Sequence, residues 1–221
     1  MKNTWTKVDE YFGDLLAPED DALRQVLRAN DEAGLPPICV SRMQGKFLSL
    51  LVKIAQARRV LEIGTLGGYS TVWMARALPA NGRIVTLEMD PKHAEVASRN
   101  LLAAGVQDRV DLRLGRALDT LPSLQASGAG PFDLVFIDAN KENNPEYLEW
   151  AVKLGRTGTV IVVDNVVREG NVIDAKSRKG DVLATRRMTE LMARHPRLSA
   201  TALQTVGAKG YDGFVLAVIH S

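Results

Sequence analysis

The sequence predicts an α/β fold built on a mostly parallel sheet, and two observations support this. Along its 221 residues, short runs of β-branched and aliphatic residues alternate with helical patterns. Such alternation is typical of a parallel sheet with helices on both faces. The last two apolar runs, 198–206 and 214–220, are joined by a glycine-rich turn and predict an antiparallel pair at the edge. We expect one domain over 1–221, with a helical segment (1–57) before an α/β core (58–221).

The first 57 residues carry three amphipathic helical patterns. In the first, apolar residues recur at helical spacing from Val8 to Leu16. A second begins after Pro18, with acidic residues in its first turn, and stops at Gly34. Ser41 is typical of an N-cap for the third, whose apolar stripe runs to Ile54. We expect these apolar side chains to pack in the core, although the segment could also wall a substrate pocket or contact another subunit.

The alternating elements of the core follow from Val60 onward. The predicted strands are 59–64, 83–88, 110–115, 132–138 and 158–164. The predicted helices lie near 69–78, 91–104, 117–125, 143–154 and 181–194. A polar and basic loop with Arg168, Lys176, Arg178 and Lys179 precedes the last helix. This loop could attract an anionic acceptor, or its charges could simply be solvated.

Composition and charge exclude several classes of protein. A net charge of +2 gives no large basic field, so nucleic acid is not an expected partner. No apolar stretch is long enough to predict a membrane span, and Met1–Trp5 begins no signal peptide. The one cysteine, Cys39, excludes an internal disulfide. The expected location is the cytoplasm.

Residues 59–70 predict a turn that binds a small molecule. An apolar strand ending at Ile63 is followed by Gly64, Gly67 and Gly68, and a helical pattern begins near Ser70. This strand, glycine-rich turn and helix form the unit that binds nucleotides in open α/β sheets. The spacing is G-x-x-G-G, whereas the dinucleotide fingerprint is G-x-G-x-x-G. By themselves, the glycines would also fit a plain tight connection.

Acidic residues near the ends of three predicted strands indicate which ligand the turn binds. Glu62 stands two residues before Gly64, Glu88 ends the second strand, and Asp138 ends the fourth. These carboxylates would repel phosphates. They suit a ligand with an ammonium, a sulfonium and a ribose diol. Glu88 can accept hydrogen bonds from both ribose hydroxyls. S-adenosylmethionine (SAM) is such a ligand.

Two neighbouring strand ends also predict a cation site. Asp138 ends one strand and Asp164 with Asn165 ends the next, and such ends meet at one edge of a parallel sheet. Three hard oxygen ligands suit Mg²⁺, with Mn²⁺ or Ca²⁺ as alternatives, although an Asp here is also a common turn former. Lys141 follows three residues after Asp138, and a nearby cation should lower its pKa. We take Lys141 as the candidate general base. The alternative is a solvated surface lysine, which is the commoner case for lysines in general.

The sequence resembles the cation-dependent class of SAM-dependent O-methyltransferases, which includes catechol and caffeoyl-CoA O-methyltransferases and bacterial relatives. The matching stretches fall in family order at residues 60–70, 85–90, 115–122, 132–141 and 162–165. The likeness extends over nearly the whole chain from Pro37. It implies a Rossmann-like SAM-dependent methyltransferase fold, with a seven-stranded sheet whose last strand is antiparallel. It also implies a homodimer.

The resemblance assigns roles to single residues. Lys141 matches the base and Asp138 is catalytic with it, while the metal ligands match Asp138, Asp164 and Asn165. The positions implied to bind the cofactor are Val40, Glu62, Gly64, Thr65, Gly68, Tyr69, Ser70, Glu88, Met89, Ala117 and Asp138. The implied reaction transfers the SAM methyl group to a hydroxyl of a small vicinal-dihydroxy, catechol-like phenol. Asn140 and Asn144 depart from the family pattern in the loop expected to face the acceptor, which leaves the substrate open.

Three other functions compete with this interpretation. An NAD-dependent oxidoreductase would need room for a pyrophosphate at Gly64, which Glu62 disfavours. A nucleic-acid methyltransferase would carry a basic face and an Asn/Asp-Pro-Pro motif, where this chain has Asp-Ala-Asn-Lys at 138–141. A SAM-binding protein without catalytic activity would have no reason to keep the cation ligands and Lys141.

Overall fold

The computed structural model describes residues 2–221. Its strands are Arg59–Ile63 (β1), Arg83–Glu88 (β2), Val110–Leu114 (β3), Phe132–Ile137 (β4), Gly155–Asp164 (β5), Leu198–Gly207 (β6) and Gly210–Ile219 (β7). Its α-helices are Lys2–Leu16 (α1), Asp21–Glu32 (α2), Arg42–Ile54 (α3), Tyr69–Ala77 (α4), Pro91–Ala103 (α5), Ala117–Ala126 (α6), Asn144–Leu154 (α7) and Gly180–Arg194 (α8). Short 3₁₀ helices cover Gln107–Arg109 (η1), Lys141–Asn143 (η2) and Arg168–Ile173 (η3). No helix in residues 2–221 is long and apolar enough to cross a membrane.

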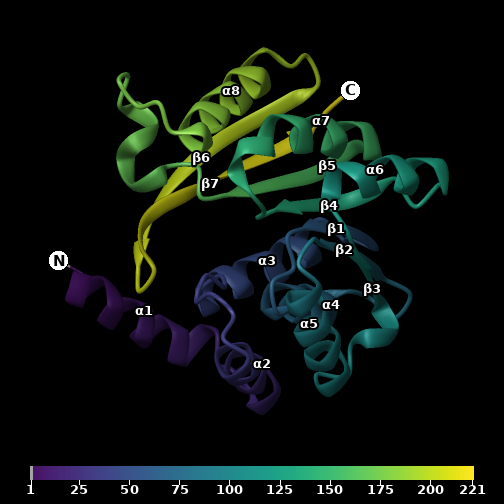
Figure 1. Ribbon diagram of the computed structural model, residues 1–221, viewed down its shortest axis with the longest axis vertical. Coiled ribbons are helices and arrows are strands. Elements are labelled where there is room, and N and C mark those ends of the chain that lie inside the picture. The colour runs from purple at the N-terminus through teal and green to yellow at the C-terminus, as the bar shows by residue number, and fades with distance from the viewer. Residues whose placement is uncertain (1) are drawn as a thin grey trace.

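The strands form one seven-stranded sheet in the order β3-β2-β1-β4-β5-β7-β6 (Figure 1). β1 to β5 are parallel, and β7 runs antiparallel between β5 and β6. This confirms the predicted mostly parallel sheet with an antiparallel last strand. Because β4 lies between β1 and β5, the carboxyl ends of these three strands are neighbours, and the residues that follow them meet at one edge.

Helices cover both faces of the sheet, with α6, α7 and α8 on one side and α3, α4 and α5 on the other (Figure 1). Alternate residues of one strand supply the two cores, since successive side chains point to opposite faces. In β1, Leu61 and Ile63 pack with α6, α7 and α8, whereas Val60 packs with α3 and α4. All three are fully buried, which matches the continuous apolar runs of a doubly covered sheet.

Two strands extend beyond their predicted ranges. β5 begins at Gly155 rather than 158, and β7 begins at Gly210 rather than 214. The glycine-rich stretch from Gly207 was predicted as a turn, yet β6 and β7 pair along it as far as Gly207 and Gly210. Gly213 is needed inside β7 because a Cβ there would lie 2.3 Å from the carbonyl oxygen of Leu203.

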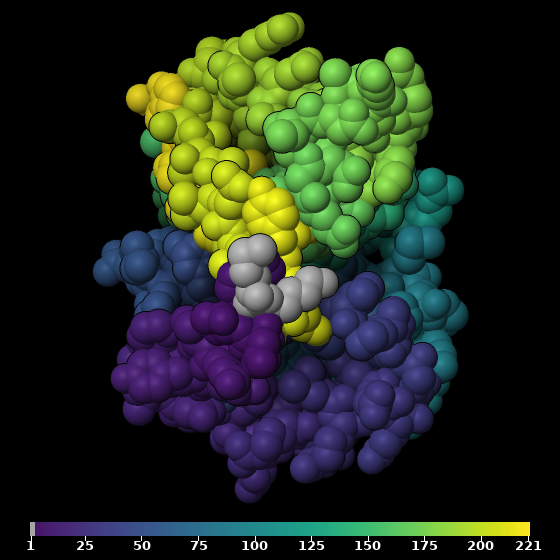
Figure 2. Space-filling view, turned by 90° about the vertical axis from the view of Figure 1, so that its left-hand side faces the viewer, coloured from purple at the N-terminus to yellow at the C-terminus, as the bar shows by residue number. Residues whose placement is uncertain are grey.

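The third helix begins at its predicted N-cap, Ser41, and the N-cap of the second is Asp20. Asp20 accepts a hydrogen bond from the Leu23 amide at 3.0 Å, and Ser41 caps α3 in a capping box with Gln44. The expectation that the apolar residues of the first helix pack in the core is wrong, because Val8, Tyr11, Phe12, Leu15 and Leu16 are all exposed. It is also wrong for the end of the third helix, where Leu50 and Ile54 are exposed. α1 lies against the tip of the β6–β7 hairpin, where Asp9 accepts from the Ala208 amide at 2.8 Å (Figure 2).

Candidate active site

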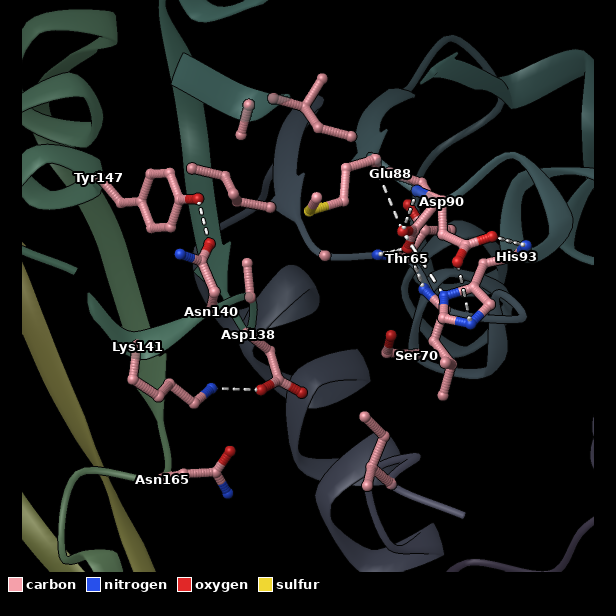
Figure 3. Close-up of a pocket in the computed structure, with 18 of the residues that line it drawn as sticks. Thr65, Ser70, Glu88, Asp90, His93, Asp138, Asn140, Lys141, Tyr147 and Asn165 are labelled. Atoms are coloured by element: carbon pink, nitrogen blue, oxygen red, sulfur yellow. Dashed lines mark hydrogen bonds and ion pairs between the residues drawn. The ribbon is translucent and has the colours of Figure 1, made fainter. Parts of the chain in front are cut away.

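A cavity of about 650 Å³ opens at the carboxyl ends of β1, β2 and β4. Most of the residues predicted for the site line it, namely Val40, Gly64, Thr65, Tyr69, Ser70, Glu88, Met89, Ala117, Asp138, Lys141 and Asn165. Figure 3 shows Lys141, Asp138 and Asn165 on one side and Glu88 on the other. Glu62, Gly68 and Asp164 are not among its lining residues.

Glu88 ties together the two turns that face the cavity. Its Oε2 accepts from the amides of Thr65 and Leu66, at 3.2 and 2.8 Å, and its Oε1 accepts from those of Met89 and Asp90, at 2.9 and 3.0 Å. The turns after β1 and β2 are therefore held at a fixed separation by one carboxylate that is 7% exposed. Its expected contact with a ribose stays a prediction.

The glycine turn is also held from the N-terminal helices. Asn100 Nδ2 donates to the Gly67 carbonyl at 2.9 Å and to Asn30 Oδ1 at 3.0 Å. Asn30 Nδ2 in turn contacts Cys39 Sγ at 3.4 Å. A Cβ at Gly67 would lie 1.8 Å from Asn30 Oδ1, so only glycine permits this approach. The segment that carries Val40 is thus connected to the turn, and it does wall the cavity as expected.

Glu62 lies beneath the cavity rather than on its surface. It is fully buried, and its carboxylate accepts from Ser70 Oγ at 2.6 Å, Thr71 Oγ1 at 2.5 Å and Thr86 Oγ1 at 2.7 Å. Burial raises the pKa of Glu62 to about 7, although these hydrogen bonds oppose the shift. In the structure Glu62 fixes the start of α4, and Ser70 is the member of this group that lines the cavity.

The raised pKa of Glu62 predicts a pH-dependent stability. Between pH 4.5 and about 7 the folded protein keeps a proton that the unfolded chain releases, so the free energy of unfolding falls as pH rises. Glu62→Gln lacks this titration. From pH 5 to 8, the stability of the wild type relative to Glu62→Gln should fall by about 2.5 kcal/mol. Urea unfolding across this range tests it, and a constant difference between the two proteins would contradict it.

Lys141 and Asp138 form an ion pair inside the cavity. Lys141 Nζ donates to Asp138 Oδ1 at 2.7 Å, and the lysine side chain is only 10% exposed (Figure 3). Asp138 follows β4 directly and its amide donates to the Ile63 carbonyl at 2.8 Å, which fixes it beside the end of β1. The structure therefore brings together the two residues predicted to be catalytic. Lys141 is enclosed and is not the solvated surface lysine that was the alternative.

Asp164 ends β5 and lines a second cavity of about 690 Å³. Asn165 and Arg168 line both cavities. Asp164 is 5% exposed, and burial, followed by the negative charge of Asp138, raises the pKa of its carboxyl. The predicted cation ligands thus flank one junction between the two cavities. Residues 2–221 hold no group of three or more His, Cys, Asp or Glu side chains placed to hold a metal ion. The predicted set of cation ligands falls outside that description, because it has two carboxylates and one amide.

The second cavity has an apolar wall next to Asp164. Phe47 and Phe214, with ring centroids 4.9 Å apart, line it together with Val40 and Met43 from the N-terminal segment. Tyr211 and Val206 enter from the hairpin. A flat apolar ring can lie against such a wall while its polar edge faces Asp164 and Asn165.

Two of the basic side chains in and after the loop make contacts within the protein. Arg168 Nε donates to Asp181 Oδ2 at 3.0 Å, and Arg186 Nε donates to the Val172 carbonyl at 2.7 Å. These two guanidinium groups therefore hold η3 against α8, while Lys176, Arg178 and Lys179 are exposed. The loop contains helix η3, which the sequence did not predict.

The two asparagines expected to face the acceptor lie in different places. Asn140 lines the first cavity, and its Oδ1 accepts from the Tyr147 hydroxyl at 2.6 Å. Asn144 is fully buried at the start of α7 and its side-chain amide has no hydrogen-bond partner among residues 2–221. The expectation that it faces the acceptor is therefore wrong, because the first turn of α7 directs it inward.

Sequence reasoning missed Gln44 and Tyr211. Gln44 lines the second cavity and lies within hydrogen-bonding range of Asp164. The pattern Ser-x-x-Gln at 41–44 does mark a capping box, and that signal places Gln44 in the first turn of α3. No local signal places Tyr211, which reaches the cavity because β7 pairs antiparallel with β5.

Comparisons with known proteins agree with this geometry. A family model described as O-methyltransferase matches residues 14–218. The chain is 58% identical over 213 residues to a catechol O-methyltransferase of Mycobacterium tuberculosis, covering 96% of this chain and 95% of that protein. The structure of an O-methyltransferase from Bacillus cereus in complex with SAH superposes with a TM-score of 0.97, at 57% identity, covering 99% and 100% of the two chains. The structure of the O-methyltransferase TomG from Streptomyces achromogenes in complex with SAM superposes with a TM-score of 0.96, at 50% identity, and the match covers 100% of this chain and 99% of that one.

Proposed function

We propose an acceptor and a cation for this chain, which belongs to the O-methyltransferase family and is a SAM-dependent methyltransferase. The acceptor is a small vicinal-dihydroxy phenol, and a divalent cation assists the transfer. One observation carries the proposal. Asp138, Asp164, Asn165 and Lys141 gather at the junction of two cavities, one lined by the glycine turn and the other by an apolar wall.

The acceptor assignment is supported by the second cavity and by a relative's name. The Mycobacterium tuberculosis protein is a catechol O-methyltransferase, and it is similar to this chain over almost the full length of both. In our chain the rings of Phe47 and Phe214 offer an apolar face for an aromatic acceptor. Carboxylate and amide oxygens beside that face suit the polar edge of a dihydroxy phenol.

The residues present fit a divalent cation. Asp164 is buried and lies near enough to Asp138 to feel its negative charge, and Asn165 adds a side-chain carbonyl oxygen at the next position. Two neighbouring carboxylates, of which Asp164 is buried and Asp138 partly exposed, with one lysine beside them favour an added positive charge. All-oxygen donors suit Mg²⁺, with Mn²⁺ or Ca²⁺ as alternatives. When bound, the cation supplies Lewis acidity that lowers the pKa of an acceptor hydroxyl.

Lys141 is the residue placed to move a proton. The ion pair with Asp138 is the resting arrangement, and once the ammonium has released one proton to solvent, the neutral Nζ can accept the proton of the acceptor hydroxyl. After this transfer the acceptor oxygen attacks the methyl carbon, and the bond from that carbon to the sulfonium sulfur breaks. Glu88 and Asn100 keep the glycine turn fixed, which aligns the two reactants. Alignment of this kind can supply roughly 7–11 kcal/mol of the acceleration.

A turnover assay tests the proposal directly. The protein is incubated with SAM and a panel of vicinal-dihydroxy phenols, with Mg²⁺ and separately with EDTA, and methylated product is measured by mass spectrometry. We expect product with Mg²⁺ and none with EDTA, because the two carboxylates then lack their cation. Product that survives EDTA would contradict the cation, and absence of product from every phenol would contradict the acceptor.

We also propose a homodimer in the cytoplasm. The exposed apolar side chains of α1, from Val8 to Leu16, and Leu50 and Ile54 of α3 are surfaces that a second copy would cover. The single free cysteine, Cys39, fits a reducing compartment.

A further inference from the structure

Gln44 joins the capping box of α3 to the carboxylate of Asp164. Its side-chain Oε1 accepts from the Ser41 amide at 2.9 Å. Its Nε2 lies 3.4 Å from Asp164 Oδ1 and 3.3 Å from Oδ2, so one amide spans both carboxylate oxygens. Because the Ser41 amide can only donate, it fixes which end of the Gln44 side chain is the oxygen. The NH₂ group must then point at Asp164.

The position of Gln44 is fixed by the packing of α3. The next residue, Gly45, lies so close to α4 that a Cβ there would be 2.4 Å from Trp73 Cδ1. Leu48 and Val52 are buried on the same side of the helix. The first turn of α3 therefore cannot shift along α4, and Gln44 reaches Asp164 from a rigid base.

Asp164 has few other contacts that could orient its carboxylate. Its Oδ1 accepts from the Asn165 amide at 2.8 Å. Among residues 2–221, Gln44 is the only side chain that donates to it. One hydrogen bond to a single oxygen leaves the carboxylate free to rotate about its last bond, whereas a second donor between the two oxygens limits that rotation.

We propose that Gln44 is a positioning residue that holds the Asp164 carboxylate in the orientation that binds the divalent cation. The inference rests on the proposed cation site and adds a residue outside the ligand set. Partners that orient carboxylate ligands generally change metal affinity 10- to 100-fold when removed. Because both Nε2 distances are long, we expect an effect near the lower end, roughly tenfold.

The capping box supplies a matched control for the test. Ser41 Oγ accepts from the Gln44 amide at 3.2 Å, so Ser41→Ala removes one arm of the box and leaves the Gln44 side chain on Asp164. Gln44→Ala removes the other arm together with the contact to Asp164. Both variants lose helix capping, and only one loses the donor.

The experiment titrates Mn²⁺ alone into cofactor-free protein by calorimetry, and thermal unfolding of each variant is measured alongside. We expect Gln44→Ala to bind Mn²⁺ roughly tenfold more weakly than wild type and Ser41→Ala to bind as wild type does. The unfolding midpoints of both variants should fall to a similar extent. Gln44→Met, which keeps the length of the side chain, replaces Gln44→Ala if that variant does not fold.

Two results would overturn the inference while the cation site stands. Equal Mn²⁺ affinity in wild type and Gln44→Ala would show that Asp164 needs no partner. Equal weakening in Ser41→Ala and Gln44→Ala would assign the effect to the helix cap. If wild type itself binds no Mn²⁺, the proposed cation site fails first and this inference falls with it.

Discussion

Replacing Lys141 with alanine is expected to lower kcat by about 10²- to 10⁴-fold, the range supplied by a positioned general base. The dissociation constant for SAM should stay close to its wild-type value, since the turns tied by Glu88 and Asn100 do not depend on Lys141. The loss of kcat is expected because Lys141 Nζ is enclosed in the cavity beside Asp138, where it can reach the acceptor hydroxyl. Steady-state kinetics with calorimetric SAM binding measure both quantities.

Lys141→Arg separates proton transfer from charge. A guanidinium keeps the positive charge and can still pair with Asp138, but it does not give up its proton in a protein. We therefore expect the arginine variant to be nearly as inactive as the alanine variant. Near wild-type turnover in Lys141→Arg would show that the lysine acts through its charge. Normal turnover with lost SAM binding in Lys141→Ala would contradict the role altogether.

The sequence was sufficient to predict the residues that follow strand ends. Asp138, Lys141 and Asn165 meet because β4 and β5 are parallel neighbours, so their distance depends only on topology and short local loops. The same reasoning located the glycine turn of β1. Where a residue's place depends on one strand end, the pattern of the sequence carries the information.

Other placements depend on several distant elements at once. The hydroxyls of Ser70, Thr71 and Thr86 that enclose Glu62 were not predicted, because only the completed packing of β1, β2 and α4 brings them together. The expected contact of Glu62 with the cofactor stays a prediction. The apolar face of α1 was expected in the core, yet it is exposed. An amphipathic pattern shows that one face of a helix is apolar, but it does not show what packs against that face.

Gly64→Ala is expected to lower the free energy of unfolding by about 4 kcal/mol, from two separate costs. Gly64 has φ +99°, a conformation that a residue with a Cβ rarely adopts. A Cβ there would also lie 2.2 Å from the Asp138 carbonyl oxygen, which belongs to backbone and cannot rotate away. Urea unfolding measures the loss.

Gly105→Ala is the matched control, since Gly105 has φ +67° and no atom within 4 Å of the added Cβ. It should cost only the backbone strain, about 1–2 kcal/mol. The difference between the variants then reports the contact between Gly64 and Asp138. Since relief of that contact moves the Asp138 backbone, Gly64→Ala should also lose turnover at temperatures where it is folded, while Gly105→Ala keeps it. If Gly64→Ala and Gly105→Ala were equally destabilised and both fully active, the close packing of Gly64 against the Asp138 backbone would be contradicted.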